Sequence, residues 1–357
     1  MSRPLTSMAM TMAALALGGC MLLAPAVPTA AEGAITVLPM TPSEPAGLAW
    51  LEDGTIITSL REELPPPGRA AVGHTMVGLE GDEWTPLEGL GISDDPACAL
   101  VGYLAPASAA DGRIILARHC VTPEATPPVE HIDLIAFDRA TGAIESLVDV
   151  DDYDPRGWLA PVGATMSPDL SEAIVWVGGG GCATLLRWRD GALEPWDLEV
   201  GQGDRRGPVG RPAGGDQEAC MDSVLASDPD WSPDGSSIAF AAAPAAIGFP
   251  ELDRIEVPRD VYVVPAAGGE PRVLLEGVAV PRGVVWSPDG KQLLVAGEID
   301  GIPQVVVVVD AETGARRPVA TGVFDWIDWS PDGTSMAGIV YTRGQPSRIV
   351  TAQVPAA

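Results

Sequence analysis

The sequence has few basic residues. Its 21 lysines and arginines stand against 49 aspartates and glutamates, which gives a formal net charge of −28. A chain with this charge repels polyanions over a long range. Nucleic acid is therefore not an expected partner.

Long apolar runs are missing beyond the N-terminal segment. A membrane-spanning helix needs about 18 to 20 mostly apolar residues in a row, and the later run at residues 305–309 is short enough to be a buried strand. We expect no transmembrane span. Because 46% of the residues are apolar and only 20% are charged, we expect a globular fold with a large core.

The first 31 residues differ from the rest of the chain. Arg3 is the only charged residue before Glu32, and residues 8–24 form an apolar run that is followed by small residues and prolines at 25–31. This pattern is typical of a secretory signal. We therefore predict that residues 1–31 lie outside the fold and that the protein is exported, to the periplasm, the cell surface or the medium.

The signal has two alternative ends. Leu17-Gly-Gly-Cys20 resembles a bacterial lipobox, which makes Cys20 a candidate lipid anchor. However, the apolar run continues through residues 21–24, where a lipoprotein usually has a polar tether. The alternative is that Cys20 belongs to the apolar part of a signal that is cleaved near Ala26 or Ala31.

A repeated Trp-Ser-Pro-Asp-Gly unit is the most informative feature of the sequence. Full copies and weaker ones, most of them followed by a short apolar run, lie at residues 50–54, 111–112, 166–169, 231–235, 286–290 and 329–333. In a type I turn, proline sets φ at the second position, aspartate bonds to the local backbone, and glycine takes the left-handed position. Each copy therefore predicts a tight hairpin.

The repeat predicts an all-β fold. A second turn follows within most units, so each unit holds four strands, and the repeated aspartates are spaced at propeller-blade length. One four-stranded blade cannot bury both of its faces alone. We predict a six-bladed β-propeller of four-stranded antiparallel blades over residues 34–357. The last unit lacks a fourth strand, so the N-terminal segment 34–38 is predicted to close the last blade.

The Trp-Ser-Pro-Asp-Gly unit resembles the repeat of TolB-like six-bladed propellers, over about residues 34–357. The resemblance implies the fold. It does not imply a function, because one fold hosts many functions. The segment between the predicted signal and the first repeat is too short for the α/β domain that precedes the propeller of TolB, so we do not expect a role in the TolB envelope system.

The connections of the predicted blades divide between two faces. The tight turns leave on one face, which we call the tight-turn face, and the longer segments leave on the other, the long-loop face. Long loops on a rigid scaffold commonly carry binding sites, whereas the repeated Trp and Asp are predicted to specify the fold. The candidate binding residues of the long-loop face are Arg61, His74, His119, His131, Arg156, Trp158, Arg254 and Arg282. Each has the alternative of being an ordinary solvated side chain.

Four cysteines follow the predicted signal. Cys98 and Cys120 flank the hairpin of the second unit, Cys182 begins a strand of the third unit, and Cys220 ends a long connection. An even number in an exported chain favours disulfides, and we predict Cys98–Cys120 and Cys182–Cys220. A zinc site is the weaker alternative, because the sequence has no Cys-x-x-Cys pair.

Two classes of function remain open. The first is a non-enzymatic extracytoplasmic binding or scaffolding propeller that engages a protein or peptide on the long-loop face. The alternative is a metal-assisted enzyme of the lactonase, esterase or lyase type, acting on a sugar acid or ester in the central channel. Its candidate residues on the inner strands are Asp228, Asp230, Arg282, Asp325 and Asp328. These residues have a competing interpretation, in which they fill a polar channel or bond to the backbone.

For the binding propeller we expect no cofactor, with a structural calcium ion as the alternative, whereas the metal-assisted enzyme would need a divalent metal ion in the channel. A serine hydrolase domain of the prolyl-oligopeptidase type is not expected, because the sequence contains no Gly-x-Ser-x-Gly.

Overall fold

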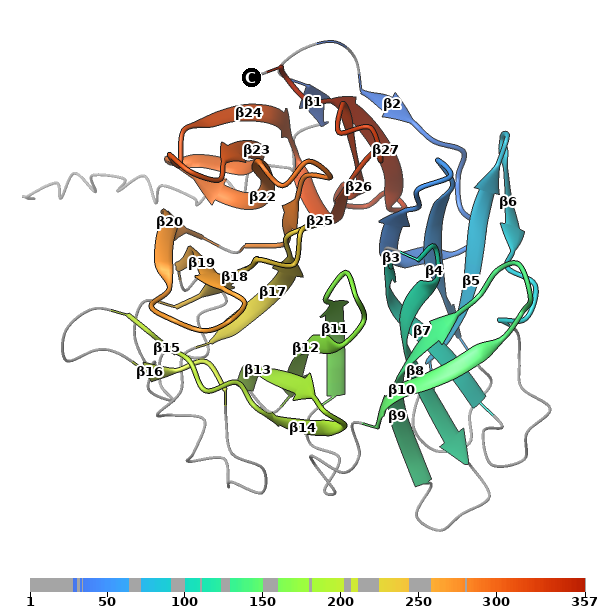
Figure 1. The fold of residues 1–357 in the computed structure, drawn as a ribbon. Coiled ribbons are helices and arrows are strands. Elements are labelled where there is room, and N and C mark those ends of the chain that lie inside the picture. The colour runs from blue at the N-terminus through green and yellow to red at the C-terminus, as the bar shows by residue number, and fades with distance from the viewer. Residues whose placement is uncertain are drawn as a thin grey trace, which may run out of the picture.

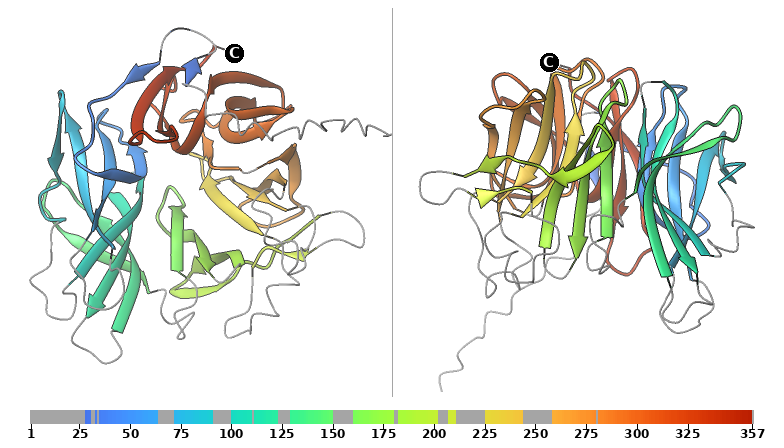
Figure 2. Two further views of the ribbon diagram at one scale, coloured as in Figure 1. Left: turned by 180° about the vertical axis from the view of Figure 1, so that it is seen from behind. Right: turned by 60° about the horizontal axis from the view of Figure 1, so that its bottom comes forward.

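The computed structural model describes residues 28–30, 33, 35–63, 72–90, 100–109, 111–122, 129–149, 160–179, 182–201, 207–210, 225–243, 258–279 and 281–356. These residues form a ring of six antiparallel blades around a central axis (Figure 1). Figure 2 shows the same ring from behind and tilted. The predicted six-bladed propeller is confirmed.

The blades follow one another in chain order, and each runs from an inner to an outer strand. Blade 1 consists of β3 (Glu44–Trp50), β4 (Ile56–Glu63), β5 (Val72–Glu80) and β6 (Glu83–Pro86). Blade 2 consists of β7 (Leu100–Ser108), β8 (Ile114–Thr122), β9 (Val129–Phe137) and β10 (Ile144–Asp149). Blade 3 consists of β11 (Ala160–Met166), β12 (Glu172–Gly179), β13 (Cys182–Arg189) and β14 (Ala192–Pro195). A short pair, β15 (Glu199–Val200) and β16 (Gly207–Pro208), follows it.

The second half of the ring repeats this arrangement. Blade 4 consists of β17 (Ala226–Trp231), β18 (Ser237–Ala242), β19 (Arg259–Pro265) and β20 (Arg272–Val278). Blade 5 consists of β21 (Val284–Trp286), β22 (Gln292–Ile299), β23 (Ile302–Asp310) and β24 (Arg316–Thr321). Blade 6 consists of β25 (Val323–Trp329), β26 (Ser335–Tyr341), β27 (Arg348–Gln353) and the N-terminal β2 (Thr36–Val37).

The N-terminal segment closes the ring, as predicted. β2 pairs with β27, with Thr36 opposite Thr351. A second short strand, β1 (Thr29–Ala30), pairs with β24 and becomes a fifth strand of blade 5. Thr29 and Ala30 lie inside the segment predicted to be the signal, so cleavage after Ala31 would remove a strand of the propeller. Among the described residues, no helix is long and apolar enough to cross a membrane.

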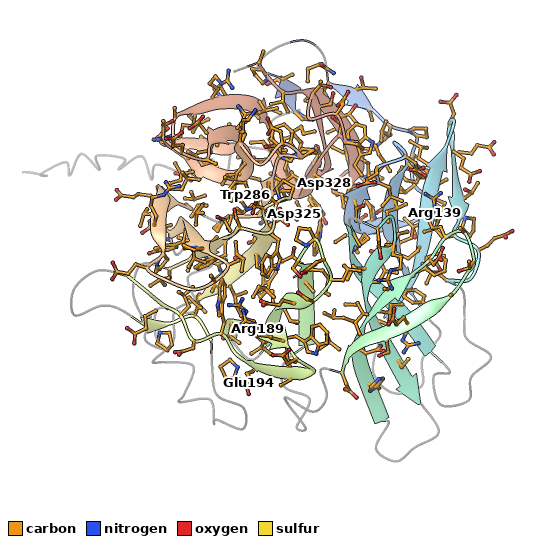
Figure 3. The ribbon with its side chains drawn as sticks, viewed as in Figure 1. Arg139, Arg189, Glu194, Trp286, Asp325 and Asp328 are labelled. Atoms are coloured by element: carbon orange, nitrogen blue, oxygen red, sulfur yellow. The ribbon has the colours of Figure 1, made fainter. Side chains whose placement is uncertain are left out.

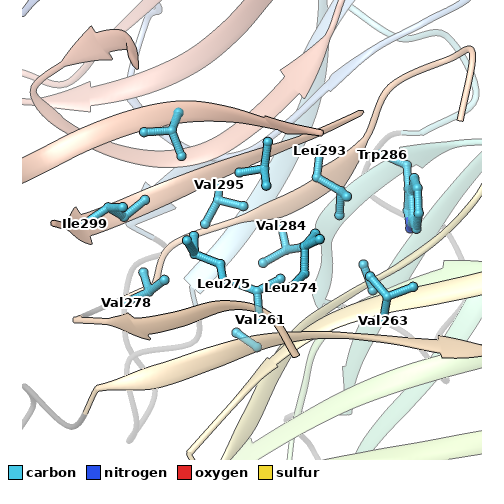
Figure 4. Packing of buried hydrophobic residues seen from close by; sticks show 14 of the residues in the cluster. Val261, Val263, Leu274, Leu275, Val278, Val284, Trp286, Leu293, Val295 and Ile299 are labelled. Atoms are coloured by element: carbon cyan, nitrogen blue, oxygen red, sulfur yellow. The ribbon is translucent and has the colours of Figure 1, made fainter. Parts of the chain in front are cut away.

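The cores lie between neighbouring blades. The valine run of β23, residues 305–309, is fully buried, and β-branched residues of this kind favour strands. Between blades 4 and 5, Val261 and Leu275 on one side form a cluster with Val284 and Leu293 on the other (Figure 4). The face of each blade is thus covered by the face of the neighbouring blade. A single blade therefore has no core of its own.

The repeated unit forms the predicted tight hairpin at the end of each inner strand. In blade 4, the backbone N–H of Ser232 donates to the carbonyl of Ser237 over 2.8 Å. The Asp234 carboxylate accepts bonds from the Ser232 hydroxyl at 2.7 Å and from the N–H of Ser236 at 2.9 Å. The same network recurs at residues 167–172, 287–292 and 330–335.

Successive turns also touch one another around the tight-turn face. Gly290 has φ of 69°, and a Cβ placed on it would lie 3.3 Å from Cγ of Pro233 in the preceding turn. In the weaker copy, Leu170 occupies the glycine position with φ of 59°. Its side chain packs against a core cluster that includes Met166, which offsets the unfavourable backbone conformation.

Two glycine substitutions separate the cost of the left-handed backbone from the cost of the contact between neighbouring turns. Gly54 has φ of 86° and open space around it, so Gly54→Ala is expected to lower the free energy of unfolding by about 1 kcal/mol, the cost of a left-handed alanine. Gly290→Ala is expected to cost more, because the new methyl group must also displace Pro233. Urea unfolding of the two variants measures the difference, and equal losses would show that the contact with Pro233 contributes nothing.

Candidate functional site: the central channel

The inner strands of all six blades line one central cavity of about 460 Å³. This volume lies within the roughly 300–1,000 Å³ of ordinary ligand pockets. The wall is rich in indole rings although aromatic residues make up only 5% of the chain. The tryptophans that line the cavity are Trp50, Trp176, Trp231, Trp286, Trp326 and Trp329.

The inner strands are irregular where they face the cavity. Register shifts interrupt β3, β7, β11, β17 and β25 when each pairs with its neighbour. In blades 4 and 6 the bulge contains a residue with positive φ, Asp228 at 54° and Trp326 at 50°. A bulge turns side chains away from the regular alternation of a strand. Both residues line the cavity.

Two aspartates of the cavity join neighbouring blades. Asp230 in blade 4 accepts the backbone N–H of Trp286 in blade 5 through Oδ2 at 2.7 Å. Its Oδ1 lies 3.2 Å from the hydroxyl oxygen of Thr165 in blade 3. Asp328 in blade 6 accepts the N–H of Trp50 in blade 1 at 2.7 Å. These carboxylates therefore bond to backbone groups across blade boundaries, and the Asp328 bond joins the last blade to the first.

Burial raises the pKa of both aspartates. The pKa of Asp230 rises from its ordinary 3.8 to about 7, and that of Asp328 rises to about 6, while the accepted N–H bonds oppose the shift. A raised pKa means that the folded protein favours the protonated acid. The contribution of each group to stability is therefore fully present below pH 3.8 and is lost as the pH rises through its folded pKa.

Asp230→Asn is expected to be stabilising at alkaline pH. An amide retains the bond from Trp286 through its oxygen, donates to Thr165 through its nitrogen, and cannot ionise. We expect the free energy of unfolding to rise by about 1 kcal/mol at pH 8 and to change little at pH 4. Urea unfolding at the two pH values measures both numbers.

Asp328→Asn is the matched control, because both oxygens of Asp328 accept backbone N–H groups, from Trp50 and from Trp329 at 2.8 Å. An amide can accept only one of them and sets an N–H against the other. We expect this variant to be less stable than Asp230→Asn by about 1–3 kcal/mol. Equal behaviour of the two variants would contradict the assigned hydrogen bonds.

Four charged residues lie near the starts of β17, β19, β21 and β25, toward the long-loop face, and two of them, Asp228 and Arg282, line the cavity. Arg282 lines the cavity, has a side chain that is 39% exposed, and donates to Asp325 over 2.6 Å. Asp228 accepts the hydroxyl of Ser227 at 2.6 Å, and burial raises its pKa. Arg259 donates to the same hydroxyl at 2.5 Å. We call Asp228, Arg259, Arg282 and Asp325 the charged mouth. Figure 3 labels Asp325, together with Asp328 and Trp286.

Of the eight predicted binding residues, the structure describes the side chains of two, Arg282 and His131, and only Arg282 lines the cavity. Arg282 lies at the charged mouth. His131 lies on β9, with its Nδ1 3.9 Å from Oδ1 of Asp149, and it does not line the cavity. Arg61 and His74 are opposite each other in the register of β4 and β5.

Several predicted residues fall beyond what the structure describes. His119 pairs with Gly102 on one side and with Ile132 on the other in the register of blade 2. For Arg61, His74 and His119, the structure describes the backbone only. Arg156, Trp158 and Arg254 lie outside the described residues.

The cysteine predictions are described only in part. Cys120 is buried on β8 and is disulfide-bonded. Cys98, Cys220 and Cys20 lie outside the described residues, and Cys182 is described only by its place opposite Gly179. The pairings Cys98–Cys120 and Cys182–Cys220 and the lipid anchor on Cys20 therefore stay predictions.

The sequence interpretation missed the role of the repeat in the cavity. Its tryptophans were expected to specify the fold only, yet they line the channel, together with serines and prolines of the same turns. The turn residues in the cavity wall are Ser167, Pro168, Ser232, Pro233, Ser287, Pro288 and Pro331. The sequence signal was present, because the repeat places each tryptophan at the end of an inner strand. Within the described residues, no group of three or more His, Cys, Asp or Glu side chains has the arrangement of a metal site.

Comparison with known proteins gives likenesses of fold. No family model matches the chain. A segment of 131 residues, 36% of the chain, is 37% identical to the uncharacterized peptidase YuxL of Bacillus subtilis, and the chain spans 17% of that protein. TolB from Acinetobacter baumannii is 16% identical, with a TM-score of 0.52 over 84% of this chain and 63% of that one.

Two further solved structures are similar over most of both chains. Regucalcin from Agrobacterium tumefaciens, a calcium-binding protein, is 14% identical with a TM-score of 0.51 over 89% of this chain and 94% of that one. A luciferin-regenerating enzyme is 12% identical with a TM-score of 0.52, over 93% and 96% of the two chains. At these identities the likeness shows the fold alone. The chain is a six-bladed β-propeller. Its repeat and its likeness to TolB make it a TolB-like propeller.

Proposed function

We propose that the protein is a non-enzymatic extracytoplasmic binding propeller. Its partner is a protein or peptide segment that approaches the long-loop face and enters the central cavity at the charged mouth. The observation that carries the proposal is one continuous cavity with tryptophan walls and the half-exposed Arg282–Asp325 pair at its entrance. Aromatic and arginine side chains of this kind are the groups that dominate the binding energy of protein interfaces.

The aspartates of the channel support binding more than metal-assisted chemistry. A metal ligand must direct its lone pairs at the ion, whereas Asp230 and Asp328 direct theirs at backbone N–H groups of the neighbouring blades. The alternative of a metal-assisted enzyme acting on a sugar acid or ester needs these carboxylates to leave bonds that hold the ring together. The match to a peptidase covers 17% of that relative, so a peptidase activity is not part of this proposal.

Export belongs to the proposal as well. The segment 1–31 carries the secretory pattern, and either a lipid on Cys20 or a cleaved signal places the propeller outside the cytoplasm. The net charge of −28 disfavours polyanions and is compatible with a protein or peptide partner.

Reversing one charge at the mouth tests the binding role. The Arg282–Asp325 pair is exposed enough for Arg282→Asp to cost little stability, but it places two like charges where the partner enters. In a crosslinking pull-down from the native envelope, we expect a partner that wild type captures to be reduced at least tenfold by Arg282→Asp.

The matched control is Arg189→Asp. Arg189 is half-exposed and paired with Glu172 on the outer part of blade 3 (Figure 3), far from the mouth. The Arg189→Asp variant is expected to capture the partner as well as the wild type does. A partner lost equally in both variants, or retained in both, would contradict binding at the mouth.

Calorimetric melting with calcium and with EDTA tests the alternative. A binding propeller without a metal site is expected to melt at the same temperature in both, within about 1 °C. A calcium-dependent rise of several degrees would instead favour the metal-assisted enzyme or a structural ion.

A further inference from the structure

The first described segment of the chain, residues 28–30, is built into blade 5. β1 runs antiparallel to β24, with Thr29 opposite Thr321 and Ala30 opposite Ala320 (Figure 1). The hydroxyl groups of Thr29 and Thr321 are hydrogen-bonded, with their oxygens 2.6 Å apart. In the described part of the chain the other five blades have four strands each. The fifth strand is therefore a property of this segment and not a requirement of the ring.

The same segment packs against the interior of blades 5 and 6. Ala30 lies against a buried cluster that includes Val306 and Phe324. Pro28 lies over Gly322, where an added Cβ would be 3.1 Å from the Cβ of Pro28. Gly322 also has φ of 146°, a conformation that suits glycine. A residue almost 300 positions away thus leaves room for Pro28, so the segment fits the propeller as a native part of it.

β1 also covers a strand edge. β24 is the last strand of blade 5 that comes from the body of the chain, and β1 pairs with its outer side. An uncovered edge presents a row of unpaired backbone groups to other chains and promotes aggregation. Loss of β1 would expose the edge of β24 at residues 320 and 321.

The predicted signal offers cleavage positions on both sides of β1. Ala24-Pro-Ala26 and Thr29-Ala-Ala31 each place small residues at the two positions that a signal peptidase reads. Cleavage after Ala31 would separate β1 from the propeller. Cleavage after Ala26 would leave Val27 as the residue before Pro28, and β1 would stay attached.

We propose that export processing takes place before Pro28 and that the mature protein keeps residues 28–30 as the fifth strand of blade 5. Two reactions satisfy this. In the first, water splits the Ala26–Val27 bond and leaves a free amine on Val27. In the second, the Cys20 thiol takes a diacylglyceryl group from a membrane phospholipid, and water then splits the Gly19–Cys20 bond. The inference rests on the export that belongs to the proposed function, and it names the site of processing.

Intact-mass analysis and N-terminal sequencing of the protein from its native host test the site. We expect a chain that begins at Val27, or at Cys20 with the added mass of the lipid. A chain that begins at Glu32, or at any residue after Pro28, would overturn the inference and leave export standing. A chain that keeps Met1 would overturn the export on which the inference rests.

Two variants of the full chain test whether β1 is retained in the folded protein. Neighbouring residues of a strand face opposite sides, and Ala30 packs on the core whereas Thr29 is exposed. In the mature protein, Ala30→Asp is expected to lower the urea midpoint by about 0.3–0.5 M, because a carboxylate replaces a methyl group on the core. The matched control, Thr29→Asp, is expected to stay within about 0.2 M of wild type.

The mass of each variant is measured with its midpoint, so that a change of processing is seen. If residues 28–30 are removed on export, both variants give the same mature chain as wild type, and equal midpoints overturn the inference.

A double-mutant cycle carries the test if Ala30→Asp does not fold. Gly322→Ala is expected to lower the midpoint, and Pro28→Gly is expected to restore part of the loss, because it removes the ring that the new methyl group meets. An absence of coupling between the two substitutions would show that Pro28 is missing from the mature protein.

Discussion

A hydrogen bond between a buried carboxylate of one blade and a backbone N–H of the next joins the inner strands at two blade boundaries, between blades 4 and 5 and between blades 6 and 1. The inner strands approach one another at the axis, where the large side chains of the interblade cores give way to a channel. Asp328 and Trp50 join the last blade to the first at this point. At the outer edge, Thr36 and Val37 of β2 pair with β27, and the N–H of Leu38 donates to the carbonyl of Ile349. Between the inner and outer contacts, a core cluster packs blade 1 against blade 6. The inner bond therefore completes a closure that strand pairing and apolar packing also hold.

This way of holding the ring determines the chemistry of the channel. A carboxylate that is buried to accept a backbone N–H loses its hydration, which raises the pKa of Asp230 to about 7 and of Asp328 to about 6. The same bonds engage the carboxylates of Asp230 and Asp328 with backbone groups of the protein itself. These two aspartates of the channel wall therefore serve the fold.

Much of the fold was predictable from the sequence, and less of the site. The turn chemistry of Ser232–Pro–Asp–Gly235 is local, so the hairpins and the blade period follow from the residues themselves. The bulges at Asp228 and Trp326 depend on how neighbouring strands pair, which no local pattern encodes. For the same reason, β1 was not foreseen, whereas the position of four of the tryptophans in the cavity wall was encoded by the repeat, which places each of them at the end of an inner strand.

The blades differ in the residue that precedes the repeated unit, and this residue determines how neighbouring inner strands are joined. The residue before the first position of the repeated unit is Thr165 in blade 3, where that position is Met166, and Asp230, Val285 and Asp328 in blades 4, 5 and 6, where it is tryptophan. Where it is Val285, its side chain accepts nothing and its carbonyl takes the indole of Trp329 in the following blade. Where it is Asp230 or Asp328, the carboxylate takes the backbone N–H of the tryptophan in the next blade, Trp286 or Trp50. Small changes at one position of the unit therefore decide which blade boundaries are joined by a buried carboxylate.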